Sequence, residues 1–106
     1  MSTPPPRFRT FVDNHPAISD AYQQLGLAIK KSGPLDDRTA QLVKIGIAVG
    51  MQHEGAVHAH TRKALDAGCT PEELHHAVVL ATTTLGFPSM MAALTWVDDV
   101  LEEDAE

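Results

Sequence analysis

Apolar side chains recur at helical spacing between residues 17 and 31. They follow one another in steps of three or four residues: Ile18, Tyr22, Leu25 and Ile29. This spacing places them on one face of an amphipathic helix. Pro16 suits the first turn of that helix, because its missing N–H would have no partner there. Gly33-Pro34 ends the helix.

The next predicted helix, residues 37–52, differs because its second half is apolar on every side. Asp36 is a favourable N-cap residue for it. The segment from Ile45 to Met51 contains only apolar residues and glycine, and such a helix must be buried all round. Gly46 and Gly50 lower helix propensity, so we expect them to allow the close approach of a neighbouring backbone.

A third predicted helix carries the segment GMQHEGAVHAHTR, residues 50–62, and ends at Ala67-Gly68. The fourth begins after Thr70, where three start signals coincide. These are an N-cap threonine, a proline at the first helical position and a glutamate three residues after the cap. We expect this helix to reach about residue 85.

Gly86-Phe87-Pro88 interrupts the chain before a last amphipathic helix, which covers about residues 90–102. No segment has the pattern of a strand. The fold class is therefore all-α, a small bundle of about five helices in a single domain of residues 15–103. Residues 1–14 are expected to form an extended arm. Residues 104–106 are expected to form an acidic tail, part of a solvated helix end that begins at Asp98-Asp99.

The apolar surface of these helices exceeds what one short chain can cover. Helices around residues 45–51 and 77–85 would leave a large exposed apolar patch on a lone bundle, and such patches usually mark association. We expect an obligate homo-oligomer in which these helices meet across subunits.

The composition excludes several classes of protein. With 43% hydrophobic and 21% charged residues, the chain is typical of a globular protein rather than a disordered one. The net charge of −6 argues against sequence-independent binding to nucleic acid, which requires a basic surface. No apolar run approaches the ~20 residues of a membrane span. We therefore expect no nucleic-acid partner and no membrane partner.

The sequence also indicates a compartment. The N-terminal residues have no apolar region of a secretory signal. The single cysteine, Cys69, cannot form an internal disulfide. We expect a cytoplasmic protein, and with no partner cysteine and no evident activating group we expect Cys69 to be inert.

Four side chains that could carry chemistry crowd into eight residues: His53, Glu54, His58 and His60. If the helix is continuous, its geometry places His53 and His60 in the middle of the apolar, inward face. These two histidines would be about 10 Å apart along the helix axis, too far to share one metal ion directly. Glu54 and His58 would lie together at the edge of that face, where they could share a metal ion, a proton or a hydrogen bond.

Acid–base chemistry is the first interpretation of this cluster. An unperturbed imidazole titrates near ~6.5, so His53 and His60 could act as general acid–base groups, with Glu54 orienting or charge-balancing His58. A second interpretation is non-enzymatic: the histidines would only satisfy a subunit interface in an oligomeric binding protein.

Metal binding is the third interpretation. Glu54 and His58 would hold a transition-metal ion, and nitrogen and oxygen ligands of this kind suit Zn, Ni, Cu or Fe(II). Further ligands could come from the same segment or from the next helix: His53, His60, His75 or His76. Such a site could serve a metal-dependent oxidoreductase.

Four segments occur in a characteristic order: LDDRTAQLVKIGIAVG at 35–50, HTRKALDAG at 60–68, TPEEL at 70–74 and GFP at 86–88. Together they resemble the carboxymuconolactone decarboxylase family, which includes the alkylhydroperoxidase D-like proteins. The resemblance covers about residues 17–101. The resemblance implies an all-α fold that assembles into dimers, trimers or hexamers.

The resemblance also implies where functional residues of the family would lie. Its peroxidase branch has a Cys-x-x-Cys pair followed four residues later by a histidine, with a glutamate twelve residues before the first cysteine. With that histidine aligned on His60, the cysteine positions hold His53 and Ala56, and the glutamate position holds Gln41. Peroxide reduction needs a thiolate and a resolving thiol, so thiol peroxidase activity is not expected.

The decarboxylase branch also lacks the cysteine pair and keeps the helical histidine. Resemblance to that branch implies a histidine-lined pocket and proton transfer on a small organic acid or lactone, as in decarboxylation or isomerisation. Gln41 departs from the family pattern here too, because glutamine can donate and accept hydrogen bonds but cannot shuttle a proton.

Overall fold

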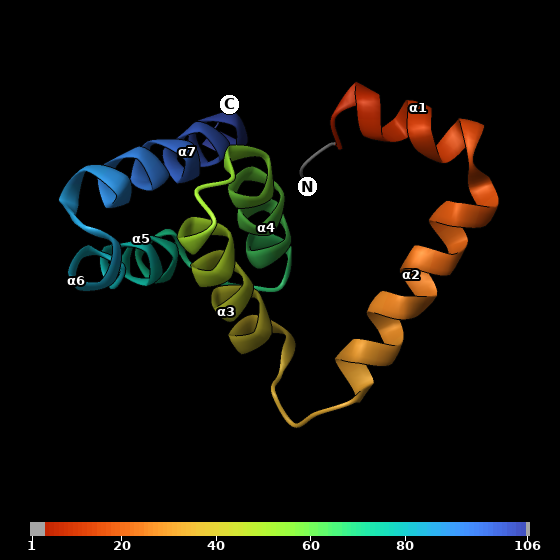
Figure 1. Ribbon diagram of the computed structural model, residues 1–106, viewed down its shortest axis with the longest axis horizontal. Coiled ribbons are helices and arrows are strands. Elements are labelled where there is room, and N and C mark those ends of the chain that lie inside the picture. The colour runs from red at the N-terminus through yellow and green to blue at the C-terminus, as the bar shows by residue number, and fades with distance from the viewer. Residues whose placement is uncertain (1–3, 106) are drawn as a thin grey trace. The chain divides into compact units, whose positions relative to one another are not determined.

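The computed structural model describes residues 4–105, and within that range the chain contains helices and no strand (Figure 1). The predicted all-α fold class is confirmed. In chain order the helices are α1 (Pro6–Asn14), α2 (Pro16–Lys31), α3 (Asp37–Gly50), α4 (Glu54–Asp66), α5 (Pro71–Val79), α6 (Thr82–Leu85) and α7 (Phe87–Ala105). They belong to two compact units, residues 4–35 and residues 36–105.

The first unit begins with a helix where an extended arm was expected. The prediction for residues 1–14 was wrong over α1, which starts at Pro6. Pro6, the last residue of the run Pro4-Pro5-Pro6, occupies the first turn of α1. A proline is tolerated there, so this run leads into a helix and does not prevent one. Residues 1–3 lie outside the described part of the chain.

By its contacts, α2 groups with α1 and not with the helices that follow it. Hydrogen bonding runs almost continuously through His15, which joins the two helices. Its N–H donates to the carbonyl oxygen of Phe11, and its own carbonyl accepts from the N–H of Ser19. The boundary between the two units therefore falls between residues 35 and 36.

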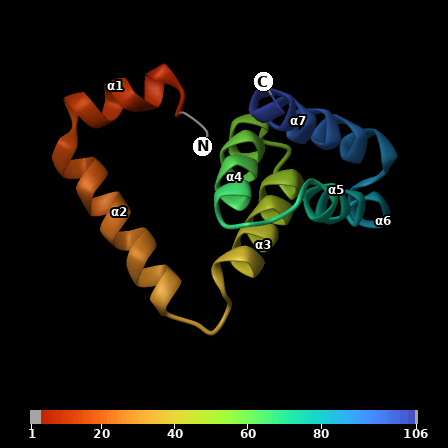
Figure 2. The same ribbon diagram turned by 180° about the vertical axis from the view of Figure 1, so that it is seen from behind.

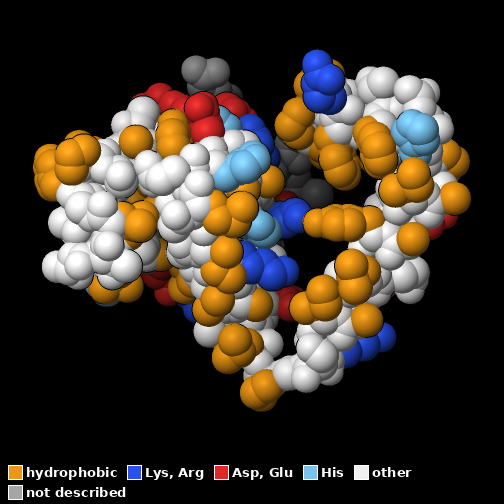
Figure 3. Space-filling view, viewed as in Figure 1, with side chains coloured by type: hydrophobic (Ala, Val, Ile, Leu, Met, Phe, Trp, Pro, Cys, Tyr) orange, Lys and Arg blue, Asp and Glu red, His pale blue; other side chains and the backbone are white. Residues whose placement is uncertain are grey.

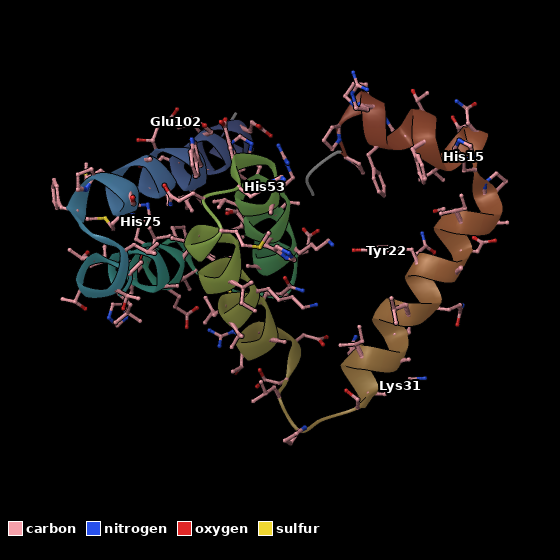
Figure 4. All side chains as sticks on the ribbon, in the orientation of Figure 1. His15, Tyr22, Lys31, His53, His75 and Glu102 are labelled. Atoms are coloured by element: carbon pink, nitrogen blue, oxygen red, sulfur yellow. The ribbon has the colours of Figure 1, made fainter. Side chains whose placement is uncertain are left out.

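The predicted apolar face of α2 exists, but its own unit does not cover it. Ser19 is the buried residue of this helix. Large apolar side chains along α2 keep 45–70% of their surface exposed: Ile18, Tyr22, Leu25, Leu27 and Ile29. Tyr22 projects clear of the helix (Figure 4). This apolar face of α2 is therefore left open by residues 4–35.

Four helices of the second unit share one core. α3 and α7 each contact both α4 and α5, as Figures 1 and 2 show from opposite sides. Fully buried side chains come from all four helices: Ile45, Val49, Val57, Ala64, Leu74, Val78, Ala93 and Val97. This core fixes the relative positions of the helices that carry the candidate site residues.

The predicted caps are present at the starts of α3 and α5. The side chain of Asp36 accepts a hydrogen bond from the N–H of Thr39 at 2.8 Å. Thr70 and Glu73 form a complete capping box, in which each side chain accepts from the other residue's N–H, at 3.1 and 2.8 Å. The guanidinium of Arg38 pairs with the carboxylate of Glu73, which ties the first turn of α3 to the first turn of α5.

The fourth and fifth predicted helices were placed correctly but bounded wrongly. The helix expected to reach residue 85 breaks after Val79, and α6 follows as a separate short helix. Gly86 has φ +99°, a conformation that suits glycine, and this turn lets α7 start at Phe87 with Pro88 in its first turn. The Gly-Phe-Pro segment thus begins α7 three residues earlier than expected.

α7 also extends further than predicted, through residue 105, so most of the expected acidic tail is helical. Residue 106 lies outside the described part of the chain. Although α7 has 19 residues, neither it nor any other described helix has the combined length and apolar character to cross a membrane.

α3 is apolar on two sides, and the chain buries only one of them. The buried side carries Ile45, Ala48 and Val49. The other side carries three apolar side chains that are 48–64% exposed: Val43, Ile47 and Met51. A Cβ added at Gly46 or Gly50, on this second side, would meet no heavy atom within 4 Å. The backbone approach expected at these glycines is therefore not supplied by the described part of the chain. Figure 3 shows hydrophobic side chains at the surface over α3.

Candidate functional site

His53 lies outside the helix in which the sequence placed it. α3 ends at Gly50, the chain turns through Gln52 at φ +52°, and α4 begins only at Glu54. His53 is the exposed N-cap of α4, and its Nδ1 accepts a hydrogen bond from the N–H of Ala56 at 3.0 Å. The prediction of an inward-facing His53 was wrong, because it assumed a continuous helix through this turn.

His60 lies where the sequence placed it, on the side of α4 that faces α3. Its side chain is partly buried, and its Nδ1 lies 3.3 Å from Oε1 of Gln41. With Oε1 of Gln41 as the acceptor, Nδ1 is the donor. In this tautomer of the neutral imidazole the lone pair is on Nε2.

The surroundings of His60 favour its neutral form. Burial lowers the pKa of the imidazole, and the positive charges of Lys63 and Lys44 lower it further. Both effects act in the same direction, because each disfavours the imidazolium. Burial and the two lysine charges therefore both favour the neutral imidazole of His60 over the imidazolium.

Glu54, His58 and Asp99 converge at the edge of the contact between α4 and α7. Nε2 of His58 lies 3.2 Å from Oδ2 of Asp99 and 3.9 Å from Oε2 of Glu54. The predicted closeness of Glu54 and His58 is confirmed. Asp99 was not predicted, because it is 41 residues from His58 and only the packing of α7 against α4 brings it there.

The histidine pair at the fourth predicted helix does not join this cluster. Nε2 of His75 lies 2.6 Å from Oδ1 of Asp98, on α7. His76 is exposed and faces a groove on another side of α5. Figure 4 shows His53 and His75 on separate elements. Among the residues that the structure describes, the group of three or more that could hold a metal ion is Glu54, His58 and Asp99, without His53 or His60.

Cys69 is buried and has no cysteine partner. Its Sγ lies 3.6 Å from the carbonyl oxygen of Arg38. Burial is the main effect on this thiol, and it raises the pKa. A protonated, buried thiol is a poor nucleophile, so its environment agrees with the expectation that Cys69 is inert.

A groove of about 590 Å³ runs between α3 on one side and α5 and α6 on the other. Its polar side chains come from four residues: Thr39, Glu73, His76 and Thr84. The rest of the lining consists of apolar residues and glycines: Leu42, Val43, Gly46, Gly50, Ala77, Leu80, Ala81 and Leu85. Of the histidines, only His76 lines it. The groove is therefore separate from His53, His58 and His60, and it includes the open side of α3.

The described chain is an all-α protein in which His60 lies on α4, the helix that follows the apolar, glycine-containing α3. The carboxymuconolactone decarboxylase family model matches residues 16–99. The chain belongs to the carboxymuconolactone decarboxylase family.

A solved structure supports the same assignment. The fold is similar to that of apo-lpg0406, a carboxymuconolactone decarboxylase family protein from Legionella pneumophila, with a TM-score of 0.74 and 27% sequence identity. The alignment covers 91% of this chain and 86% of that one. No curated protein matches the sequence significantly.

Proposed function

We propose that the chain is a carboxymuconolactone decarboxylase-like enzyme that transfers a proton on a small organic acid or lactone, with Nε2 of His60 as the general base. The observation that carries this proposal is the partly buried His60, whose Nδ1 faces Gln41. A general base is most effective when its pKa lies near the working pH and its lone pair is free. In support of this role, the lowered pKa of His60 favours the neutral imidazole, and the contact with Gln41 leaves Nε2 free to accept a proton.

Each neighbour of His60 has a role in this chemistry. Gln41 holds the Nδ1–H tautomer and cannot itself take up a proton. Lys44 and Lys63, whose charges act on His60, would attract the carboxylate of an organic acid or the developing negative charge of an enolate. His60 would remove a proton from carbon beside a carbonyl group and return it to the same or a neighbouring carbon.

The other candidate residues take different roles in this proposal. His53 caps α4 and so helps to position the helix that carries His60. His58 and Glu54 face Asp99 and do not contact Gln41 or His60 in any hydrogen bond of the described residues. A thiol peroxidase is not proposed, because the positions aligned with the cysteine pair hold His53 and Ala56.

The test measures proton exchange at carbon. Wild-type protein would be incubated in D₂O with a panel of small lactones, unsaturated acids and β-keto acids, and loss of C–H signal would be followed by NMR. A His60→Gln variant should lower the rate by about 10²–10⁴, the usual contribution of a general base. His76→Gln, at an exposed histidine on α5, should leave the rate within about twofold.

A chelator should leave the rate unchanged, since the proposed base needs no metal. Equal turnover by wild type and His60→Gln would contradict the proposal. Loss of turnover only in His76→Gln would move the reaction to the groove. Absence of exchange with the whole panel would favour the non-enzymatic interpretation.

We also propose that the protein functions as a homo-oligomer in which a second copy covers the open side of α3. The support is the exposed stripe of Val43, Ile47 and Met51 beside the apolar groove. Gly46 and Gly50 leave room on this side for a closely packed helix. Light scattering should give a mass above one chain of 11.4 kDa, and Ile47→Glu should reduce it towards that value.

Thr83→Glu is the matched control for this experiment. It adds the same charge at an exposed position on α6, outside the apolar stripe of α3, so it should leave the mass unchanged. A single-chain mass for the wild type at micromolar concentration would rule out a stable oligomer.

A further inference from the structure

We propose that Glu54, His58 and Asp99 form a binding site for a divalent transition-metal ion, with Zn²⁺ as the reference ion. This site is independent of the proton-transfer role proposed for His60, because the two histidines face different helices. His60 meets Gln41 on α3 at 3.3 Å, and His58 meets Asp99 on α7 at 3.2 Å.

The distances among the donor atoms fit one ion after small movements. Nitrogen and oxygen ligands lie about 2.0–2.2 Å from Zn²⁺, so a tetrahedral site places neighbouring ligand atoms about 3.3–3.6 Å apart. Nε2 of His58 lies 3.2 Å from Oδ2 of Asp99 and 3.9 Å from Oε2 of Glu54. All three donor atoms lie within 4.8 Å of one another. Rotation of the Glu54 and Asp99 side chains, which are 57% and 47% exposed, would close the remaining gap.

The helices hold the three residues in this register. Glu54 and His58 are one turn apart on α4 and therefore neighbours in space. One further turn along both helices, the guanidinium of Arg62 lies 3.1 Å from the carboxylate of Glu103. Because this pair spans the same two helices as His58 and Asp99, it keeps Asp99 opposite His58.

The donor set favours a transition metal over other cations. Two carboxylates face one imidazole nitrogen, so with neutral His58 the site carries two negative charges. A protonated His58 would balance one of these charges, whereas a divalent ion balances both. Imidazole nitrogen together with carboxylate oxygen suits Zn²⁺, Ni²⁺, Cu²⁺ and Fe²⁺, whereas Mg²⁺ and Ca²⁺ prefer oxygen ligands alone.

Three protein ligands would leave a further position of the ion for water or a substrate atom, as in catalytic zinc sites. Binding requires the lone pair of His58 Nε2, so its proton must move to Nδ1 or leave the residue.

The test uses the full-length, untagged protein after treatment with a chelator. Zn²⁺ would be titrated by calorimetry, with competition against a colorimetric chelator, and Co²⁺ would be added separately as a spectroscopic probe. We expect one Zn²⁺ ion per chain, and visible Co²⁺ absorption bands typical of a site with nitrogen and oxygen ligands.

Variants on both helices keep the test decisive. Asp99→Asn and Glu54→Gln should each weaken Zn²⁺ binding at least tenfold, and His58→Gln should abolish it. Asp98→Asn is the matched control, because Asp98 is the neighbouring acid on α7 but pairs with His75. It should change the affinity less than twofold. Circular dichroism would verify that each variant keeps its helical content.

Two results would overturn this inference. The first is the absence of a stoichiometric site in the wild type. The second is Zn²⁺ binding that survives both Asp99→Asn and Glu54→Gln, which would assign the ion to other histidines. Neither result would affect the proton-exchange test of His60, so failure of the metal site and failure of the proposed function are distinguishable.

Discussion

Replacement of Leu74 by alanine is the sharpest test of the packing that positions α5. Leu74 is fully buried in the core shared by α3, α4, α5 and α7. Leu74→Ala removes three carbon atoms, and at about 0.8 kcal/mol per buried methylene the transfer cost is about 2.4 kcal/mol. The cavity that remains raises the expected loss of stability to about 3–5 kcal/mol. Because domains of this size are stable by about 5–15 kcal/mol, this substitution would remove a large share of the free energy of unfolding.

Leu80→Ala provides the comparison within the same short segment. Leu80 is 64% exposed and lines the groove, so the same chemical change should cost less than about 1 kcal/mol in a single chain. Urea denaturation followed by circular dichroism would measure both variants at two protein concentrations. If a second copy covers the groove, the effect of Leu80→Ala should grow at the higher concentration, where the wild type is stabilised by association. Equal, concentration-independent losses for the two variants would refute the division between buried core and open groove.

Three further predictions concern single residues. The folded state lowers the pKa of His60, so the unfolded chain binds more protons than the folded chain as the pH falls below about 6.5. The free energy of unfolding should therefore decline below that pH, and unfolding curves of His60→Gln should show a weaker decline than those of the wild type. Gln41→Glu should raise the pKa of His60 by placing a negative charge beside it, which an NMR titration of the ring protons would detect, whereas an unchanged value would disprove the contact. Gly86→Ala should cost about 1–3 kcal/mol in thermal unfolding, because φ +99° and ψ 157° are essentially restricted to glycine, whereas Gly46→Ala has open space around it and should not destabilise the single chain.

Local signals in the sequence were sufficient for much of the fold. Asp36 and the Thr70–Glu73 box have the residue types that satisfy the first N–H groups of a helix, and both caps are present. Two helix starts were missed where a proline was taken as a break in the chain. Pro6 and Pro88 each lie in the first turn of a helix, where their missing N–H costs nothing. Composition alone cannot distinguish a proline that ends a helix from one that starts the next.

The site was predictable only where its residues share a helix or a family pattern. Glu54 and His58 are one turn apart, so helical periodicity found their contact. The family pattern singled out Gln41 and His60, and the structure places Oε1 of Gln41 3.3 Å from Nδ1 of His60. Asp99 could not be predicted, because its approach to His58 depends on how α7 packs against α4. His53 was misplaced because histidine is not among the residues that usually cap helices, so nothing signalled a helix start after it.

The residues at the family's functional positions change the chemistry that this chain could perform. Where the peroxidase branch of the family has a glutamate, Gln41 contacts Nδ1 of His60 without a charge. A carboxylate there would stabilise the imidazolium and raise its pKa, whereas the amide leaves burial, Lys63 and Lys44 to lower it. In the proposed reaction, Gln41 would therefore keep His60 a neutral base, where a carboxylate would relay a proton. The carboxylate of the proposed organic-acid substrate, drawn by the lysine charges, would then supply the missing negative charge and raise the proton affinity of His60 on binding.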